Sequence, residues 1–348
     1  MQSTTIGLDI AKHVFQLVAC DVRGKVVKKK VLRRGQVLSY FAQMPAVLIG
    51  MEGCASAHYW ARELTAQGHR VDLLPAQYVK GYVRGNKNDY NDALAIGEAV
   101  RGSEMRRIPI KTTAQQDVQA LHRLREGQIK VRTAHANRIR GLLAEYGIIV
   151  PQGVSTLRRR LPEILEDGEN GLSPLFRELL AQSLDQLRAL DEQVGEYDRR
   201  VRTHSRTDED CRRLQTIPGY GPIVASIFAS YVGDGRGYRR GRDVSASVGL
   251  VPRQHRTGGK ATLFGISKRG DRYVRCLLVH GARSVVRAAA HKDDPLSRWI
   301  NRLRERRGVN KATVALANKM ARIGWAVIRT RATVKSGVWP VDVRRLSC

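Results

Sequence analysis

The sequence has few cysteines, few aromatic residues and no long hydrophobic run. Five cysteines occur among 348 residues, and no two form a CxxC pair. An odd number without such pairing argues against a disulfide framework and against a structural zinc site. No apolar run reaches the roughly 18 residues of a membrane span, and the first residues lack the basic and apolar regions of a signal peptide. These absences predict a protein of the reducing cytoplasm without a membrane partner.

Acidic residues are also scarce relative to basic ones. Lys and Arg total 61 whereas Asp and Glu total 32, which gives a formal net charge of +29. Hydrophobic residues make up 42%, enough to build a core. A foldable chain with this excess of positive charge is typical of proteins that bind a polyanion, usually nucleic acid. Because aromatic residues make up only 6%, we expect electrostatic contacts to outweigh base stacking.

The first hundred residues alternate short apolar runs with helical stretches. Helices are expected at 55–67 and 92–100. Strands are expected at 5–10, 14–20, 25–32, 46–51 and 71–74. Three initial strands followed by alternating helices and strands indicate a mixed α/β sheet.

Two long helical patterns follow. Residues 114–146 contain no proline and place apolar residues at helical spacing. Residues 151–174 contain three prolines and three glycines, so we expect a connector there. An apolar residue then recurs every seven positions, at Leu180, Leu187, Val194 and Val201. This repeat fits a dimeric coiled coil or an antiparallel hairpin within one chain, and it predicts an arm or a dimer stalk.

The most basic stretch lies in the last third of the chain. Residues 231–310 hold 19 Lys or Arg and 6 Asp or Glu. Just before it, residues 217–222 read IPGYGP, which is similar to a helix-hairpin-helix turn. Gly219 and Gly221 would let the chain bend and leave backbone N–H groups for phosphate oxygens. The alternative is a plain packing corner between two helices.

Four acidic residues occupy positions from which they can converge. Asp9 and Glu52 each end an apolar run, and Asp89 and Asp92 lie three residues apart at the start of a predicted helix. Strand ends and helix starts meet at one edge of an α/β sheet. Each acid alone could be a turn or helix-capping residue. Together, in so basic a chain, they predict a site for two Mg²⁺ ions, with Mn²⁺ as the alternative ion, of the kind that activates and stabilises oxygens in phosphodiester transfer.

Several motifs, taken in order, resemble a known family. They are GLDIAK, MEG, NKNDYNDA, LQTIPGYGPIVA, SVGLVPRQHRTGGK, GISKRGDRYVR and ANKMARIGWAV, which span nearly the whole chain. The set resembles the DEDD transposases of insertion sequences of the one-ten and eleven-eleven type. The resemblance implies an RNase-H-like (RuvC-like) α/β domain, a helical arm and a mainly α C-terminal domain. It also implies that Asp9, Glu52, Asp89 and Asp92 bind the metal ions.

The resemblance further implies a hydroxyl nucleophile in the second domain. Where the family has a serine that attacks DNA, this chain has Thr257. A threonine hydroxyl can act as a nucleophile, although its methyl group stiffens the side chain. The alternatives are that Ser267 takes over or that this copy is impaired. Basic residues around this position are expected to hold phosphates: Arg253, Lys260, Lys268, Arg269 and Arg272.

From these observations we expect an insertion-sequence transposase. The expected parts are a catalytic domain at 1–110, an arm at 111–205, a transposase domain at 206–332 and a tail at 333–348. By resemblance, its partners are DNA, a structured noncoding guide RNA and further copies of itself as a dimer or tetramer, in the bacterial cytoplasm at the nucleoid. The alternatives are a metal-dependent junction resolvase or nuclease that uses water, and a decayed protein that only binds nucleic acid.

Overall fold

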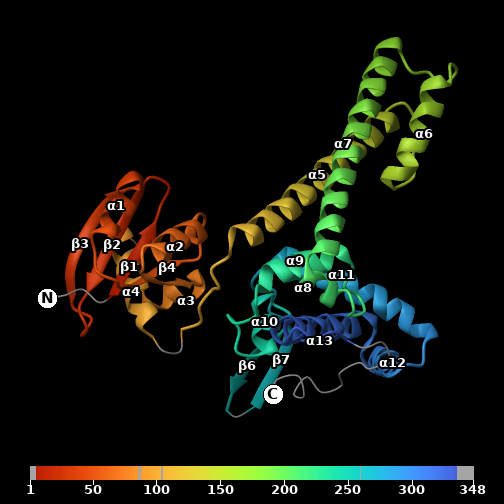
Figure 1. Cartoon of the computed structure of the whole chain (residues 1–348). Coiled ribbons are helices and arrows are strands. Elements are labelled where there is room, and N and C mark those ends of the chain that lie inside the picture. The colour runs from red at the N-terminus through yellow and green to blue at the C-terminus, as the bar shows by residue number, and fades with distance from the viewer. Residues whose placement is uncertain (1–4, 85–87, 103–104, 259, 335–348) are drawn as a thin grey trace. The chain divides into compact units, whose positions relative to one another are not determined.

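The computed structural model describes residues 5–84, 88–102, 105–258 and 260–334. Contacts divide the chain into two units, Met1–Thr113 and Ala114–Cys348 (Figure 1). Most of the expected tail, 333–348, lies outside the described residues. Within the described part of the chain, no helix has the length and apolar character needed to cross a membrane.

The first unit is built on a five-stranded mixed sheet with the order β3-β2-β1-β4-β5. Its strands are β1 (Thr5–Ile10), β2 (Val14–Cys20), β3 (Val26–Arg33), β4 (Leu48–Glu52) and β5 (Arg70–Leu74). Its helices are α1 (Val37–Ala42), α2 (Ala57–Ala66), α3 (Ala76–Val79) and α4 (Asp89–Arg101), with short 3₁₀ turns at Arg34–Gln36 and Lys80–Tyr82. The pairs β1–β2 and β2–β3 are antiparallel, whereas the pairs β1–β4 and β4–β5 are parallel. The expected mixed α/β sheet is confirmed.

Side-chain alternation gives this sheet two covered faces. One face presents Ile6, Leu8, Ile49 and Met51 to a core that includes Trp60 of α2 and Phe41 of α1. The opposite face is covered by α4, whose buried residues include Ile96 and Val100. The two faces follow from the period of two in a strand.

The second unit is mainly helical. Its helices are α5 (Thr113–Ala144), α6 (Val154–Glu166), α7 (Pro174–Thr207), α8 (Glu209–Leu214), α9 (Pro222–Val232), α10 (Gly241–Ser247), α11 (Arg272–Ala288), α12 (Pro295–Arg307) and α13 (Val309–Thr330), with a 3₁₀ turn at Ala289–His291. One hairpin, β6 (Pro252–Thr257) and β7 (Lys260–Ile266), interrupts them. The first residue of α5, Thr113, belongs to the first unit.

The connector expected at 151–174 is wrong in part, because it contains the helix α6. Pro162 lies inside this helix, where it removes one backbone donor. Burial of Leu157, Leu161 and Ile164 against α5 and α7 accompanies the helix despite that loss. The three residues recur at helical spacing, a pattern that the proline and glycine content concealed.

The heptad stripe of α7 is buried within the chain. Leu180 and Leu187 belong to one core with residues of α5 and α6, and Val194 and Val201 are buried as well. Arg125 and Arg132 of α5 form ion pairs with Asp198 and Asp191 of α7, at 2.6 and 2.8 Å. The later residue of α5 pairs with the earlier residue of α7, so the two helices are antiparallel. Of the two alternatives, the structure has the hairpin.

A third helix joins this hairpin through one carboxylate. Asp191 Oδ1 accepts from Arg132 of α5, and its Oδ2 accepts from Arg158 of α6 at 2.9 Å. The Asp191 side chain is only 15% exposed, so water screens these pairs less than it would at an open surface.

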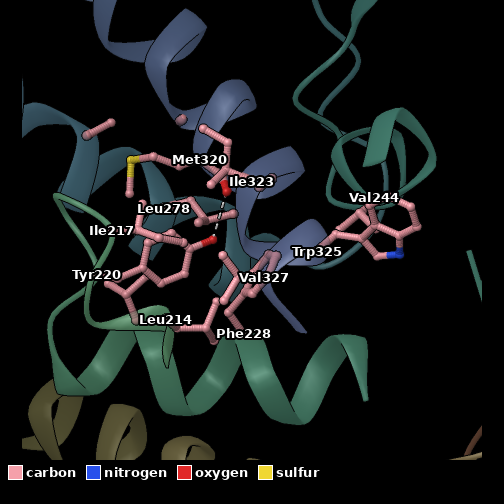
Figure 2. Packing of buried hydrophobic residues seen from close by; sticks show 14 of the residues in the cluster. Leu214, Ile217, Tyr220, Phe228, Val244, Leu278, Met320, Ile323, Trp325 and Val327 are labelled. Carbon is pink, nitrogen blue, oxygen red and sulfur yellow. Dashed lines mark hydrogen bonds between the residues drawn. The ribbon is translucent and has the colours of Figure 1, made fainter. Parts of the chain in front are cut away.

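The core of the second unit forms where α8, α9, α11 and α13 meet (Figure 2). Tyr220 packs edge-on against Phe228 and donates its hydroxyl to the carbonyl of Met320 at 3.1 Å. Gly324 of α13 makes room for this pair, because a Cβ there would lie 2.5 Å from the Tyr220 hydroxyl oxygen. Trp325 is also buried and donates to the carbonyl of Gly235.

Candidate active site

Asp9 and Glu52 are neighbours at the carboxyl ends of two parallel strands. Leu8 of β1 pairs with Met51 of β4, and the next residue in each strand is the acid. Both carboxylates are half-buried. They lie on the face that α4 covers, since Asp9 is two residues after Gly7 and Glu52 is two residues after Gly50.

Two glycines let α4 lie directly on this face. A Cβ at Gly7 would lie 2.5 Å from the backbone nitrogen of Gly97 and would also meet the carbonyl oxygen of Ala93. A Cβ at Gly50 would lie 2.8 Å from Cβ of Val100. Any larger residue at either strand position would therefore push the helix outward.

The direction of α4 places its first turn at the carboxyl edge. Its last residue, Arg101, lies against Gly24, just beyond β2. The end of β2 pairs with the start of β1, because Cys20 is opposite Thr5. The last turn of α4 is therefore at the amino end of β1, and its first turn is at the carboxyl end.

The other two predicted acids belong to this first turn. Asp89 is exposed and Asp92 is half-buried, and the side chain of Asn88 caps the helix by accepting from the Asn91 N–H at 2.7 Å. Asp92 immediately precedes Ala93, which contacts Gly7. The ends of β1 and β4 and the start of α4 thus bring the predicted acids to one edge of the sheet, on the face that α4 covers.

The chemistry of this edge suits a hard divalent cation. Its donors are carboxylate oxygens, the ligands that Mg²⁺ prefers. Burial raises the pKa of the Cys54 thiol, and the negative charges of Glu52 and Asp9 raise it further. Both acids therefore act on one point just after β4, and a cation bound there would offset their mutual repulsion.

The acids do not form a closed cage around one point. Among the described residues, the one trio of His, Cys, Asp or Glu ligand atoms within 4.8 Å of one another is His204, Asp208 and Cys211. Asp208 in that trio already caps α8 by accepting from the Cys211 N–H at 2.7 Å. No three of the predicted acids, all four of which lie in the described part of the chain, come within 4.8 Å of one another.

Thr257 lies at the end of β6 in the second unit. It is exposed, and its hydroxyl oxygen lies 3.1 Å from Nδ1 of His255. Residues two apart on a strand share a face, which brings the two side chains together. This separation is that of a hydroxyl nucleophile and its base. The alternative hydroxyl, Ser267, lies beyond β7, where its oxygen accepts a long bond from the Arg269 N–H.

Most of the predicted phosphate-binding residues surround the same hairpin. Arg253, Lys268, Arg269 and Arg272 are exposed. Lys268 adopts the left-handed backbone conformation, with φ of 56°, and Arg272 is the first residue of α11. The side chain of Lys260 lies outside the described part of the structure.

The two glycines predicted to form a phosphate-binding turn connect α8 to α9. Gly219 has φ of 91°, and a Cβ there would lie 2.9 Å from the carbonyl oxygen of Gly281 in α11. Packing therefore already requires glycine at this position. Gly221 is exposed and caps α9, whose first residue is Pro222. The packing requirement at Gly219 holds with or without a phosphate.

From the sequence, His255 could be a proton-transfer group or, more simply, a polar contact or a packed histidine, and its partner could not be identified. A strand over 252–257 would have paired it with Thr257 two residues on, but the sequence analysis did not predict that strand. It also overlooked two neighbouring apolar residues of β7, Leu263 and Phe264, which are 64% and 52% exposed. The sequence signal for these two residues was two apolar residues in succession in a basic hairpin, where a strand with one exposed face would alternate apolar and polar residues.

Two family models match the chain. A model described as "Transposase", of the DEDD type, matches residues 6–148, and one described as "Transposase IS116/IS110/IS902 family" matches residues 211–296. The predicted acids fall within the first match, and Thr257 falls within the second.

Curated relatives align over nearly the whole chain. A "Probable family 20 transposase" of Pseudomonas aeruginosa is 45% identical over 97% of this chain and 100% of its own length. The "Transposase for insertion sequence element IS1111A" of Coxiella burnetii is 44% identical over 95% of this chain and 91% of its own. The "Transposase for insertion sequence element IS1328" of Yersinia enterocolitica is 40% identical over 96% and 98%. The α/β acidic edge and the basic helical unit thus occur in a chain that belongs to the IS116/IS110/IS902 family of insertion-sequence transposases.

Proposed function

We propose that this transposase cuts and exchanges DNA strands with Asp9, Glu52, Asp89 and Asp92 as metal ligands. The observation that carries the proposal is the meeting of β1, β4 and the first turn of α4 at one edge. In a chain of net charge +29, an acidic edge would repel phosphate unless cations bridge the two.

Two Mg²⁺ ions, or Mn²⁺ in their place, are the cations that the oxygen donors fit. Bound there, they would stabilise the attacking and leaving oxygens of a phosphodiester. Asp9 and Glu52 would hold their positions because each ends a strand of the sheet. Asp89 and Asp92 would hold theirs because α4 lies directly on the strands through Gly7 and Gly50.

Thr257 is the proposed nucleophile, and His255 accepts its proton. The hydroxyl proton passes to Nδ1 of His255 while Oγ1 forms a bond to phosphorus. The P–O bond of the DNA breaks, and the leaving oxygen takes a proton from solvent water, after which His255 returns its proton to solvent. The product is a phosphothreonine link between protein and DNA. The support is the 3.1 Å separation between Oγ1 and Nδ1.

The remaining parts follow from the resemblance of the motifs. We propose residues 1–110 as the catalytic domain, 111–205 as the arm, 206–332 as the transposase domain with a helix-hairpin-helix-like turn at Gly219 and Gly221, and 333–348 as the tail. A structured noncoding RNA would select donor and target DNA by base pairing. A dimer or tetramer would combine acids of one copy with the hydroxyl of another, at the bacterial nucleoid in the cytoplasm.

Strand cleavage by purified protein with element-flank DNA, the noncoding transcript and Mg²⁺ tests the acids. Asp9→Asn and Asp92→Asn should each lower the rate by more than about a hundredfold, a larger loss than removal of an outer-shell partner causes. Glu63→Gln is the matched control, because α2 covers the opposite face of the sheet. Cleavage at the normal rate in both Asn variants would remove these acids from the site.

The covalent product tests the nucleophile separately. Thr257→Ala should abolish a protein–DNA adduct that survives denaturation, and Thr257→Ser should preserve it. A full yield of adduct with Thr257→Ala would move the nucleophile to another hydroxyl such as Ser267. Metal-dependent cleavage without any adduct in the wild type would favour the nuclease that uses water. Binding without cleavage would favour the decayed copy.

A further inference from the structure

A cavity of about 1010 Å³ lies beside the β6–β7 hairpin. Four of its lining residues belong to β7 and five more belong to the first three turns of α13. The full lining is Leu250, Pro252, Arg253, Leu263, Phe264, Gly265, Ile266, Ser267, Lys268, Asn310, Lys311, Val314, Ala315 and Asn318. Pockets of roughly 300–1,000 Å³ take drug-sized ligands, so a nucleotide fits in this volume.

The walls of this cavity are apolar and in part exposed. Phe264 is 52% exposed although the chain has only five phenylalanines, and the neighbouring Leu263 is 64% exposed. Val314 and Ala315 of α13 line the cavity as well. The space at Gly265 of β7 is open, because a Cβ there would meet nothing within 4 Å. An exposed aromatic ring beside open space can stack on a flat ligand.

The cavity is also positively charged. Arg253, Lys268 and Lys311 line it, and none of the lining residues is acidic. Lys311 lies in the first turn of α13, whose N-cap is Gly308 and receives no side-chain cap. Backbone N–H groups of such a helix start favour an anion. An apolar wall combined with basic groups fits a ligand with a flat ring and a phosphate.

One polar side chain of the cavity lining, Asn318, is held in place by a hydrogen bond. The side-chain amide of Asn318 donates to the carbonyl of Leu250 at 3.0 Å, which fixes its orientation. The side-chain oxygen of Asn318 can accept a hydrogen bond, and the edge of a nucleobase carries N–H donors.

We propose that this cavity receives an unpaired nucleobase of the DNA substrate. The base stacks on Phe264, and the flanking phosphates contact Arg253, Lys268 and Lys311. The inference rests on the proposed function for the class of ligand and adds the form in which the DNA is held. DNA is the chosen source because Arg253 and the proposed nucleophile belong to the same strand, β6. Although aromatic residues make up only 6% of the chain, one of them, Phe264, is thus placed to stack on a base.

The test is DNA binding in EDTA, measured by fluorescence anisotropy. One probe is a duplex with a single unpaired base, and the other is the same duplex with an abasic residue at that position. Wild-type protein should prefer the unpaired base by roughly 5- to 150-fold, because stacking of one base contributes about 1–3 kcal/mol. Phe264→Ala and Ala315→Trp should both remove this preference, the first by deleting the ring and the second by filling the cavity.

Two controls separate this effect from general loss of binding. Leu175→Ala removes an apolar side chain that is 67% exposed on the arm helix α7, and it should leave the preference unchanged. Lys311→Ala should weaken both duplexes equally and lower the salt slope by about one. Circular dichroism of each variant should match the wild type, since Phe264 is largely exposed.

An unchanged preference in both Phe264→Ala and Ala315→Trp overturns the inference. A preference confined to the same probe made of RNA overturns the choice of DNA. Because the assay needs neither metal nor cleavage, a failure of this inference can be distinguished from a failure of the proposed catalysis. Loss of cleavage in every condition with a normal base preference would refute the catalytic proposal alone.

Discussion

The close contact between Gly7 and α4 makes the substitution Gly7→Ala a sharp test of how the acids are positioned. The new Cβ would lie 2.5 Å from the Gly97 nitrogen and against the Ala93 carbonyl oxygen, both of which are backbone atoms. No side-chain rotation relieves such a clash, so α4 has to shift. Overpacking of this kind costs about 1–3 kcal/mol, and we expect the upper end because only backbone can give way.

The substitution Gly7→Ala should destabilise α4 in particular as well as the protein as a whole. A loss of about 3 kcal/mol corresponds to roughly a hundredfold lower hydrogen-exchange protection in peptides covering residues 89–101. Metal-dependent cleavage should fall further than the folded fraction does, because the shift separates Asp92 from Asp9. Exchange mass spectrometry and a cleavage assay on the same samples measure both effects.

The matched control is Gly35→Ala, since a Cβ at Gly35 would meet nothing within 4 Å. It should leave both protection and cleavage within about twofold of the wild type, as expected for an open surface site. Equal protection in Gly7→Ala and Gly35→Ala, together with full cleavage, would refute the argument that backbone contact sets the position of α4.

Three other predictions concern the second unit and the charge. Burial, and then the positive charges of Arg125 and His204, lower the pKa of His122 to about 4, so the unfolded chain binds the proton first. In urea unfolding followed by Trp fluorescence, this one histidine should contribute a loss of about 2–3 kcal/mol between pH 7 and 4.5, and a His122→Asn variant should lack that part of the loss. Tyr220→Phe removes the bond to the Met320 carbonyl and should lower the free energy of unfolding by about 1 kcal/mol in the same assay, whereas no change would mean that the bond contributes nothing net. DNA affinity should fall by roughly a thousandfold or more between 50 and 200 mM salt if six or more phosphates are contacted, and a flat titration would contradict the basic surface.

Most strands of the first unit could be predicted from the sequence because they are short, apolar and bounded by turn residues, although β3 contains three lysines. The strands expected at 5–10 and 14–20 are β1 and β2 with identical bounds. The helix expected from residue 92 begins earlier, at Asp89, because the side chain of Asn88 caps it. A cap depends on one hydrogen bond, which an apolar pattern does not reveal.

The pattern also could not decide which surface a buried stripe meets. The heptad of α7 would look the same against a second copy or against α5, and only the ion pairs show the antiparallel partner within the chain. Likewise, the sequence could place Asp9 and Glu52 at strand ends, but the contact between Gly7 and α4 depends on a helix ninety residues away. That these acids bind metal stays a prediction.

Asp191 has a consequence for the arm that goes beyond its two hydrogen bonds. Arg132 of α5 and Arg158 of α6 both form ion pairs with this one carboxylate of α7, so the same negative charge holds all three helices. Its conversion to a neutral amide would leave two guanidinium groups facing each other, so repulsion would replace attraction at a single point. The alignment of α5, α6 and α7 thus depends on the ionisation of one carboxylate as well as on the buried leucines of the stripe.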